Sequence, residues 1–157
     1  MTHYSVGLLA FALAHRGTSG SLPAATEVDE QTRFYWLEDK NVRGLSTKRM
    51  VWICDMAAEQ LSLYERHVQD LENMLPDLKP AISAIRQEPG LPLFSMKQGK
   101  VEPINAKAAI GAVMAKHKLR KNAGRHWLRA QLVGQCSTET FHAFGHLEKP
   151  VAPEGLK

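Results

Sequence analysis

The longest amphipathic stretch of the chain, from Met56 to Leu75, restricts the fold more than any other feature of the sequence. Its apolar residues recur at helical spacing, and its glutamates and His67 fall on the other side. The apolar positions are Leu61, Leu63, Tyr64, Val68 and Leu71. The pattern predicts a long helix that packs one face against the rest of the domain.

Two segments before this helix have the composition of strands. Arg33–Glu38 is aromatic, and Lys48–Cys54 contains apolar and β-branched residues. The polar connector Asp39–Thr47, with Asn41 and Gly44, lies between them. Strand-like segments separated by polar turn residues predict an antiparallel hairpin, in this case one with a long tip.

The rest of the chain is mostly helical in pattern. Breakers such as Gly17, Gly20, Pro23 and the Glu88–Pro92 segment separate the elements. The further elements that we expect are a buried helix at Tyr4–His15, helical segments at Leu78–Ile85, Ile104–Leu119 and Arg125–Val133, a short helix capped by Ser137, a strand at Leu93–Met96 with a turn at Gln98-Gly99, and an irregular tail at 148–157. The predicted fold class is therefore mainly α with a small antiparallel β-hairpin (α+β), in one domain of 157 residues.

The composition is that of a globular protein with a basic surface. Hydrophobic residues make up 44% and charged residues 23%, with a formal charge of +4 and a pI of about 9.2. This balance favours a polyanionic partner without identifying one. Cys54 and Cys136 share no motif, which indicates reduced thiols in a cytoplasmic protein.

The apolar run Val6–Ala14 raises the alternative of a secretory signal. No Lys or Arg precedes it, and it is too short to cross a bilayer. We therefore expect a buried helix and no membrane partner.

The segment Lys116–Arg129 has the highest density of basic residues in the chain. Such charges neutralise phosphates and supply most of the affinity of proteins for DNA. The candidate DNA-binding residues are Lys116, Lys118, Arg120, Lys121 and Arg129. The alternative is a solvated basic helix end that the helix dipole favours.

Four short motifs occur in a particular order along the chain. They are Leu13-Ala14-His15-Arg16, the hairpin segment Glu38-Asp39-Lys40, Asn122-Ala-Gly-Arg125-His126, and Phe144-Gly145-His146. This set, spanning roughly residues 5 to 147, resembles the catalytic domain of tyrosine recombinases, the phage-integrase family. The family has Thr-Gly-x-Arg, a hairpin lysine, His-x-x-Arg-His and Leu-Gly-His at these places.

The resemblance implies site-specific DNA recombination through a phosphotyrosine, without a cofactor. Arg16 and Arg125 would hold the non-bridging phosphate oxygens with paired donors. Lys40, or Lys48 on the same hairpin, would give a proton to the departing 5′-oxygen. His146 would donate a second hydrogen bond to the phosphate. The partner would be double-stranded DNA, with a homo-oligomer assembled on it.

The chain departs from the family pattern at three places. Asn122 stands where the family has its first histidine; an amide can donate a hydrogen bond to phosphate but cannot take a proton. Ser19 stands where the family has a glutamate. Tyr4, Tyr35 and Tyr64 all precede His146, although the family places its nucleophile after that box. We therefore expect a catalytic core that is truncated and inactive as an isolated chain, and the alternative is a non-catalytic DNA-binding module on the same fold.

A third alternative is a small metal-binding or interaction protein. His142 and His146 lie four residues apart, a spacing that can chelate zinc on a helix. A third ligand would have to come from His126 or Glu148, and no Glu lies between the histidines in the zincin pattern. A DNA-directed function is therefore the favoured interpretation.

Overall fold

The computed structural model describes residues 2–15, 22–38, 48–120, 123–132 and 135, and of residues 38, 48, 49, 129 and 132 it describes the backbone. The elements in chain order are α1 (Thr2–Ala12), the 3₁₀ turn η1 (Ala25–Glu27), β1 (Phe34–Glu38), β2 (Lys48–Trp52), α2 (Asp55–Met74), α3 (Lys79–Arg86), β3 (Phe94–Lys97), β4 (Lys100–Pro103), α4 (Ala106–Lys116) and α5 (Ala123–Leu132). The predicted fold class, mainly α with a small antiparallel sheet, is confirmed. The sequence predicts only the first strand of the β3–β4 hairpin.

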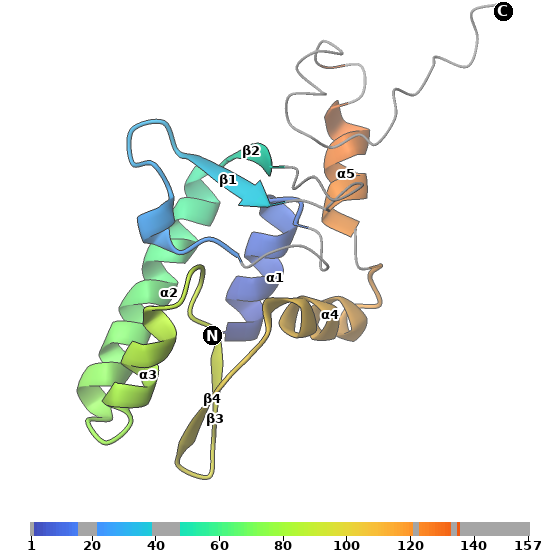
Figure 1. The fold of residues 1–157 in the computed structure, drawn as a ribbon. Coiled ribbons are helices and arrows are strands. Elements are labelled where there is room, and N and C mark those ends of the chain that lie inside the picture. Colours follow the sequence, from blue (N-terminus) through green and yellow to red (C-terminus); the bar gives the residue numbers. More distant parts are fainter. Residues whose placement is uncertain (1, 16–21, 39–47, 121–122, 133–134, 136–157) are drawn as a thin grey trace, which may run out of the picture.

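Helix α1 lies in the middle of the molecule, where it contacts α2, α4 and α5 (Figure 1). Its side chains are apolar on most sides, which is typical of a helix surrounded by other elements. Val6, Leu9 and Leu13 are fully buried in the core. The expected buried helix at Tyr4–His15 is thus present, with its helical part ending at Ala12.

A glycine allows α1 and α4 to pack closely. A Cβ atom built on Gly7 would lie 2.8 Å from Cγ1 of Val113, closer than real Cβ atoms approach a neighbour. The α4 face that meets α1 also carries Ile110 and Met114, both buried. Close packing of this kind fixes the position of α4, and therefore of the basic segment at its C-terminal end.

Helix α2 buries the predicted stripe of Leu61, Tyr64 and Val68, but two details of the prediction are wrong. Leu63 is exposed because it lies off the stripe, and Glu72 is buried because α3 packs over that position. The Glu72 carboxylate accepts hydrogen bonds from the Ser83 hydroxyl at 3.0 Å and from the Arg86 guanidinium at 2.8 Å. These two donors offset the desolvation of the buried carboxylate.

Strands β1 and β2 pair antiparallel with Phe34 opposite Trp52 and Glu38 opposite Lys48. The inner face of this hairpin contributes Leu37 and Val51 to the core. Its base is closed by a hydrogen bond of 2.8 Å from the Ile53 N–H to the Arg33 carbonyl. The expected hairpin is confirmed in its strands; its tip, 39–47, lies outside the described residues.

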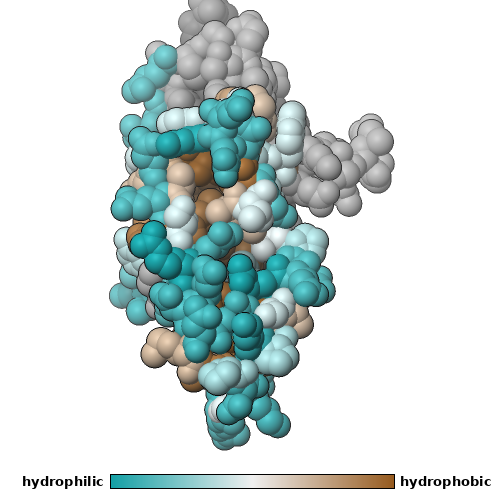
Figure 2. Space-filling model, turned by 90° about the vertical axis from the view of Figure 1, so that its left-hand side faces the viewer, coloured by the Kyte–Doolittle hydropathy of each residue, from teal (hydrophilic) through white to brown (hydrophobic). Residues whose placement is uncertain are grey.

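The face of the molecule that carries α2 and α3 is largely polar (Figure 2). Figure 2 shows the side on which α2 and α3 lie, where hydrophilic residues cover most of the face around a band of apolar ones. Among the residues that the structure describes, no helix has the length and apolar content needed to cross a bilayer.

Candidate nucleic-acid interface

The start of α5 packs against the end of α1, although more than a hundred residues separate them in the sequence. A Cβ atom on Gly124 would lie 2.9 Å from the Phe11 carbonyl oxygen, so only glycine fits at this contact. The rings of Phe11 and Trp127 lie 5.4 Å apart between centroids, tilted by 43°. The segment that carries Arg125 is therefore held at the C-terminal end of α1.

Helix α1 ends in a Schellman motif. Ala14 adopts a left-handed conformation with φ of 49°, and its N–H donates to the Phe11 carbonyl at 3.0 Å. The His15 N–H donates to the Ala10 carbonyl at 2.8 Å. Ala14 stands where the resembled motif has glycine, the residue best suited to a positive φ. The chain therefore turns sharply at Ala14, two residues before Arg16 in the sequence.

Two potentially cationic side chains, one just after α1 and one in the first turn of α5, are buried. Arg125 is 8% exposed, and His15 is 3% exposed. A guanidinium stays protonated even when buried, so its burial requires anionic or hydrogen-bonding partners. This distinguishes Arg125 from the exposed basic residues near it in sequence. Arg125 therefore lies near the end of α1, the helix that precedes Arg16 in the sequence, while Arg16 itself lies outside the described residues.

Helix α4 ends in a second Schellman motif, and the exposed basic residues lie in and around it. Lys118 has φ of 56°; its N–H donates to the Ala115 carbonyl at 3.0 Å, and the Leu119 N–H donates to the Met114 carbonyl at 2.8 Å. The side chains of Lys116, Lys118 and Arg120 are all exposed. We call these three residues the α4 basic end. Cations at this position are also favoured by the helix dipole, so their placement fits the structural alternative as well as DNA binding.

The structure places part of the predicted site. Arg125 lies in the first turn of α5, Lys116 is the last residue of α4, and Lys118 and Arg120 lie between the two helices. Arg129 lies in α5, and the structure describes only its backbone. The remaining predicted residues, Arg16, Lys40, Lys121, Asn122 and His146, lie outside the described residues. The structure thus brings together the end of α1 and the start of α5, while the relation of Arg125 to Arg16, Lys40 and His146 stays a prediction.

The three tyrosines of the chain occupy different environments. Tyr4 is exposed on α1, and Tyr35 is half-buried in β1. Tyr64 is buried in α2, and its hydroxyl donates to the Pro92 carbonyl at 3.0 Å. Burial raises the pKa of the Tyr64 hydroxyl above its ordinary value of 10.0, against a smaller opposing effect from the Thr2 hydroxyl. This environment disfavours the phenolate that a nucleophile requires.

The metal-binding alternative falls mostly outside the described part of the chain. His142, His146 and Glu148 are not described, and His126 is exposed on α5. Within the described residues, no group of three or more His, Cys, Asp or Glu side chains is arranged to hold a metal ion.

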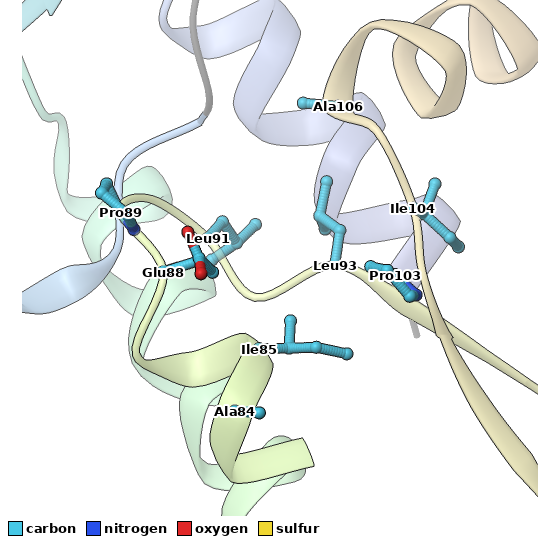
Figure 3. Close-up of a pocket in the computed structure, with 9 residues that line it drawn as sticks. All are labelled: Ala84, Ile85, Glu88, Pro89, Leu91, Leu93, Pro103, Ile104 and Ala106. Carbon is cyan, nitrogen blue, oxygen red and sulfur yellow. The ribbon is translucent and has the colours of Figure 1, made fainter. Parts of the chain in front are cut away.

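Two pockets in the described part of the chain have linings without any residue of the α4 basic end. One of about 470 Å³ lies between α3, the loop that follows it, β4 and the start of α4 (Figure 3). Its walls are apolar apart from Glu88, the single titratable group in its lining. Another, of about 280 Å³, is lined in part by His3, Tyr64 and His67. Neither lining contains a basic residue other than histidine, so neither resembles a phosphate site.

Sequence reasoning missed an exposed aromatic surface on the first hairpin. Trp36 is 61% exposed and Trp52 is 50% exposed, on neighbouring strands. The sequence contains the pattern that places these side chains on one face, because alternate residues of a strand point to the same side. Phe34 and Trp36 are two residues apart, as are Met50 and Trp52. Alternation alone did not tell which face would be buried.

Comparisons with known proteins leave the family of the chain open. No protein-family model matches the sequence, and searches of curated proteins and of solved structures gave no match.

Proposed function

We propose that this chain binds duplex DNA and that its architecture is that of a tyrosine-recombinase catalytic core. The contact between the start of α5 and the end of α1 carries the proposal. It holds buried Arg125 beside the segment leading to Arg16, with Gly124 against Phe11 as the close contact. The exposed α4 basic end lies just before α5 in the chain and supplies charges for the DNA backbone.

In this proposal the residues divide into two groups by task. Arg16 and Arg125 would bind one phosphate through paired guanidinium donors, with Asn122 and His146 as further donors and Lys40 as the proton donor. The α4 basic end would contact neighbouring phosphates and set the position of the duplex. The second group affects affinity uniformly across sequences, because phosphate contacts carry no base information.

A salt titration of duplex binding tests the second group. We expect the triple variant Lys116→Ala, Lys118→Gly, Arg120→Ala to bind a fluorescent duplex more weakly than the unchanged chain. The slope of log affinity against log salt should fall by about 3, because each cation that no longer neutralises a phosphate lowers it by roughly one. Glycine is used at position 118 because its φ is positive, so the variant keeps the turn.

A matched variant removes equal charge elsewhere. Lys97, Lys100 and Lys107 are also exposed, on the β3–β4 hairpin and in the first turn of α4. Changing all three to alanine should leave the slope of the unchanged chain nearly intact. Equal losses of affinity in both variants would mean that net charge alone governs binding, and the proposed surface would be wrong.

A nicked suicide substrate tests for cleavage chemistry. Tyr4, Tyr35 and Tyr64 all precede His146, and Tyr64 is buried with a raised pKa. We therefore expect duplex binding without covalent capture on a denaturing gel. A trapped protein–DNA adduct that disappears in a Tyr4→Phe or Tyr35→Phe variant would show a nucleophile that the resemblance does not provide.

A further inference from the structure

The outer face of the β1–β2 hairpin carries four large side chains in a compact block. Paired residues of an antiparallel sheet point to the same face, and the pairs here are Phe34 with Trp52 and Trp36 with Met50. The two tryptophans therefore lie on a diagonal of the block, at a typical Cβ separation of about 7 Å. We call these four residues the aromatic face.

The aromatic face is exposed and firmly supported. Trp36 and Trp52 are 61% and 50% exposed, while Leu37 and Val51 on the opposite face are buried in the core. The Arg33 side chain pairs with Asp55 at the first residue of α2, which ties the start of β1 to that helix. Large aromatic side chains left in water on a fixed sheet are unusual in a monomer and indicate a binding surface.

The charge of the hairpin favours an anionic partner. Residues 34–52, the hairpin itself, contain four basic and two acidic residues, an excess of two positive charges. They are Lys40, Arg43, Lys48 and Arg49 against Glu38 and Asp39; Arg33 is not counted because it pairs with Asp55. In a symmetric dimer built on this face, the excess charge would oppose itself. Two five-residue strands also provide a small area for a stable dimer, which typically buries about 800 Å² on each partner.

We propose that the aromatic face binds single-stranded DNA, with unpaired bases stacked on Trp36 and Trp52. A partner with flat π faces and a polyanionic backbone matches both properties of the hairpin, and stacking tolerates any base sequence. The inference rests on the proposed function in that it assumes a nucleic-acid ligand, but it uses a different surface from the α4 basic end. One chain would then hold duplex DNA at α4 and an unpaired strand at the hairpin.

The test is binding of a labelled oligodeoxythymidine of about 15 nucleotides, followed by fluorescence anisotropy. Trp36→Ala and Trp52→Ala should each weaken binding about tenfold, and the double variant about a hundredfold. Leucine at both positions keeps apolar bulk without a π face and should weaken binding as alanine does. Phenylalanine at both positions should keep affinity within about threefold. Tyr4→Ala removes an equally exposed aromatic side chain from α1 and should have no effect.

Duplex binding by the same variants separates this inference from the proposed function. We expect the tryptophan variants to bind duplex DNA as the unchanged chain does, and the α4 variant to keep its oligodeoxythymidine affinity within about threefold. Tryptophan-dependent binding of the single strand without duplex binding would overturn the proposed function and support the aromatic face. Duplex binding by an unchanged chain that ignores the single strand would overturn the aromatic face alone. A concentration-dependent dimer that Trp36→Ala and Trp52→Ala dissolve, with no change in single-strand affinity, would assign the face to a second copy.

Discussion

The two hairpins of this molecule have similar strand lengths but are held in place by different means. The β1–β2 hairpin buries its inner face, where Leu37 and Val51 join the core. The β3–β4 hairpin is joined by the turn Gln98-Gly99, in which both residues have positive φ, as in a type I′ turn. Its outer part is exposed, and it is attached to the core at its base.

The difference shows which hairpin can serve as a binding platform. A two-stranded sheet is marginal by itself in water, so each hairpin needs additional support. The inner face supports β1–β2 along its length and leaves the outer face fixed and free for a ligand. Support for β3–β4 comes from its turn and from buried Leu93 and Phe94 at its base. We therefore assign recognition to the first hairpin and a structural role to the second.

The largest expected effect is a loss of stability on truncating the inner face of the first hairpin. Leu37→Ala removes a fully buried side chain from β1 and should lower the free energy of unfolding by about 3 kcal/mol, because it leaves a cavity in the core. Met96→Ala removes a side chain of similar size from β3, where it is 45% exposed, and should cost less than about 1 kcal/mol. Urea unfolding followed by far-UV circular dichroism measures both.

Similar losses of stability in the two variants would contradict the comparison. In that case the second hairpin would depend on side-chain packing as strongly as the first. A measured loss below about 1 kcal/mol for Leu37→Ala would instead mean that the core does not support the first hairpin, and the aromatic face would lose its rigid base.

Local patterns predicted most of the fold because they depend on neighbours in sequence. The helical period placed α2, and aromatic and β-branched composition placed β1 and β2 within two residues of their observed bounds. The burial of Glu72 could not be predicted, because it depends on Ser83 and Arg86 arriving from α3. Strand β4 was missed for a related reason: its sequence, with two charged residues and a proline, lacks an apolar pattern, and its pairing follows from the turn before it.

The candidate site was predictable only where a motif marked it. The resemblance singled out Arg125 and the end of α1, and their contact through Gly124 and Phe11 is an outcome of tertiary packing that no local pattern contains. For the aromatic face, the sequence contains the pattern but not the exposure. Its alternation was readable from the sequence, but its exposure depends on which side of the hairpin the core occupies.

The attachment of the second hairpin gives the next largest effect. The Tyr64 hydroxyl donates to the carbonyl of Pro92, two residues before β3. Tyr64→Phe should lower the free energy of unfolding by about 1 kcal/mol at neutral pH, because it removes this buried hydrogen bond. Above pH 10 the difference should shrink. The folded state raises the pKa of Tyr64, so its stabilising effect is complete below the ordinary value of 10.0 and is lost as the pH rises through the raised pKa.

Urea unfolding of the two proteins between pH 7 and about pH 11 tests this, with the difference between them taken at each pH. Taking the difference cancels the titration of the lysines, which both proteins share. A difference that grows with pH would mean that the Tyr64 hydroxyl is more acidic in the folded state, contrary to its burial.

The last effects, of about 1 kcal/mol or less, concern glycines, the first of them in the turn of the second hairpin. Gly99 has φ of 72°, and a Cβ atom added there would have no atom within 4 Å outside its chain neighbours. Gly99→Ala should therefore destabilise the protein by about 1 kcal/mol through backbone conformation alone, without a steric clash. Thermal unfolding should register it as a fall in Tm of a few degrees.

Gly111 provides the matched comparison, because a Cβ atom there also has open space but the residue lies within helix α4. Gly111→Ala should stabilise the protein by about 0.5 to 1 kcal/mol, since alanine loses less backbone entropy than glycine in a helix. The same substitution is thus expected to act in opposite directions at the two positions. If Gly99→Ala were neutral or stabilising, the turn would tolerate another backbone conformation. The second hairpin would then be held by its base at Leu93 and Phe94 rather than by its turn. The remaining difference between the two hairpins would be that β1–β2 buries its inner face in the core.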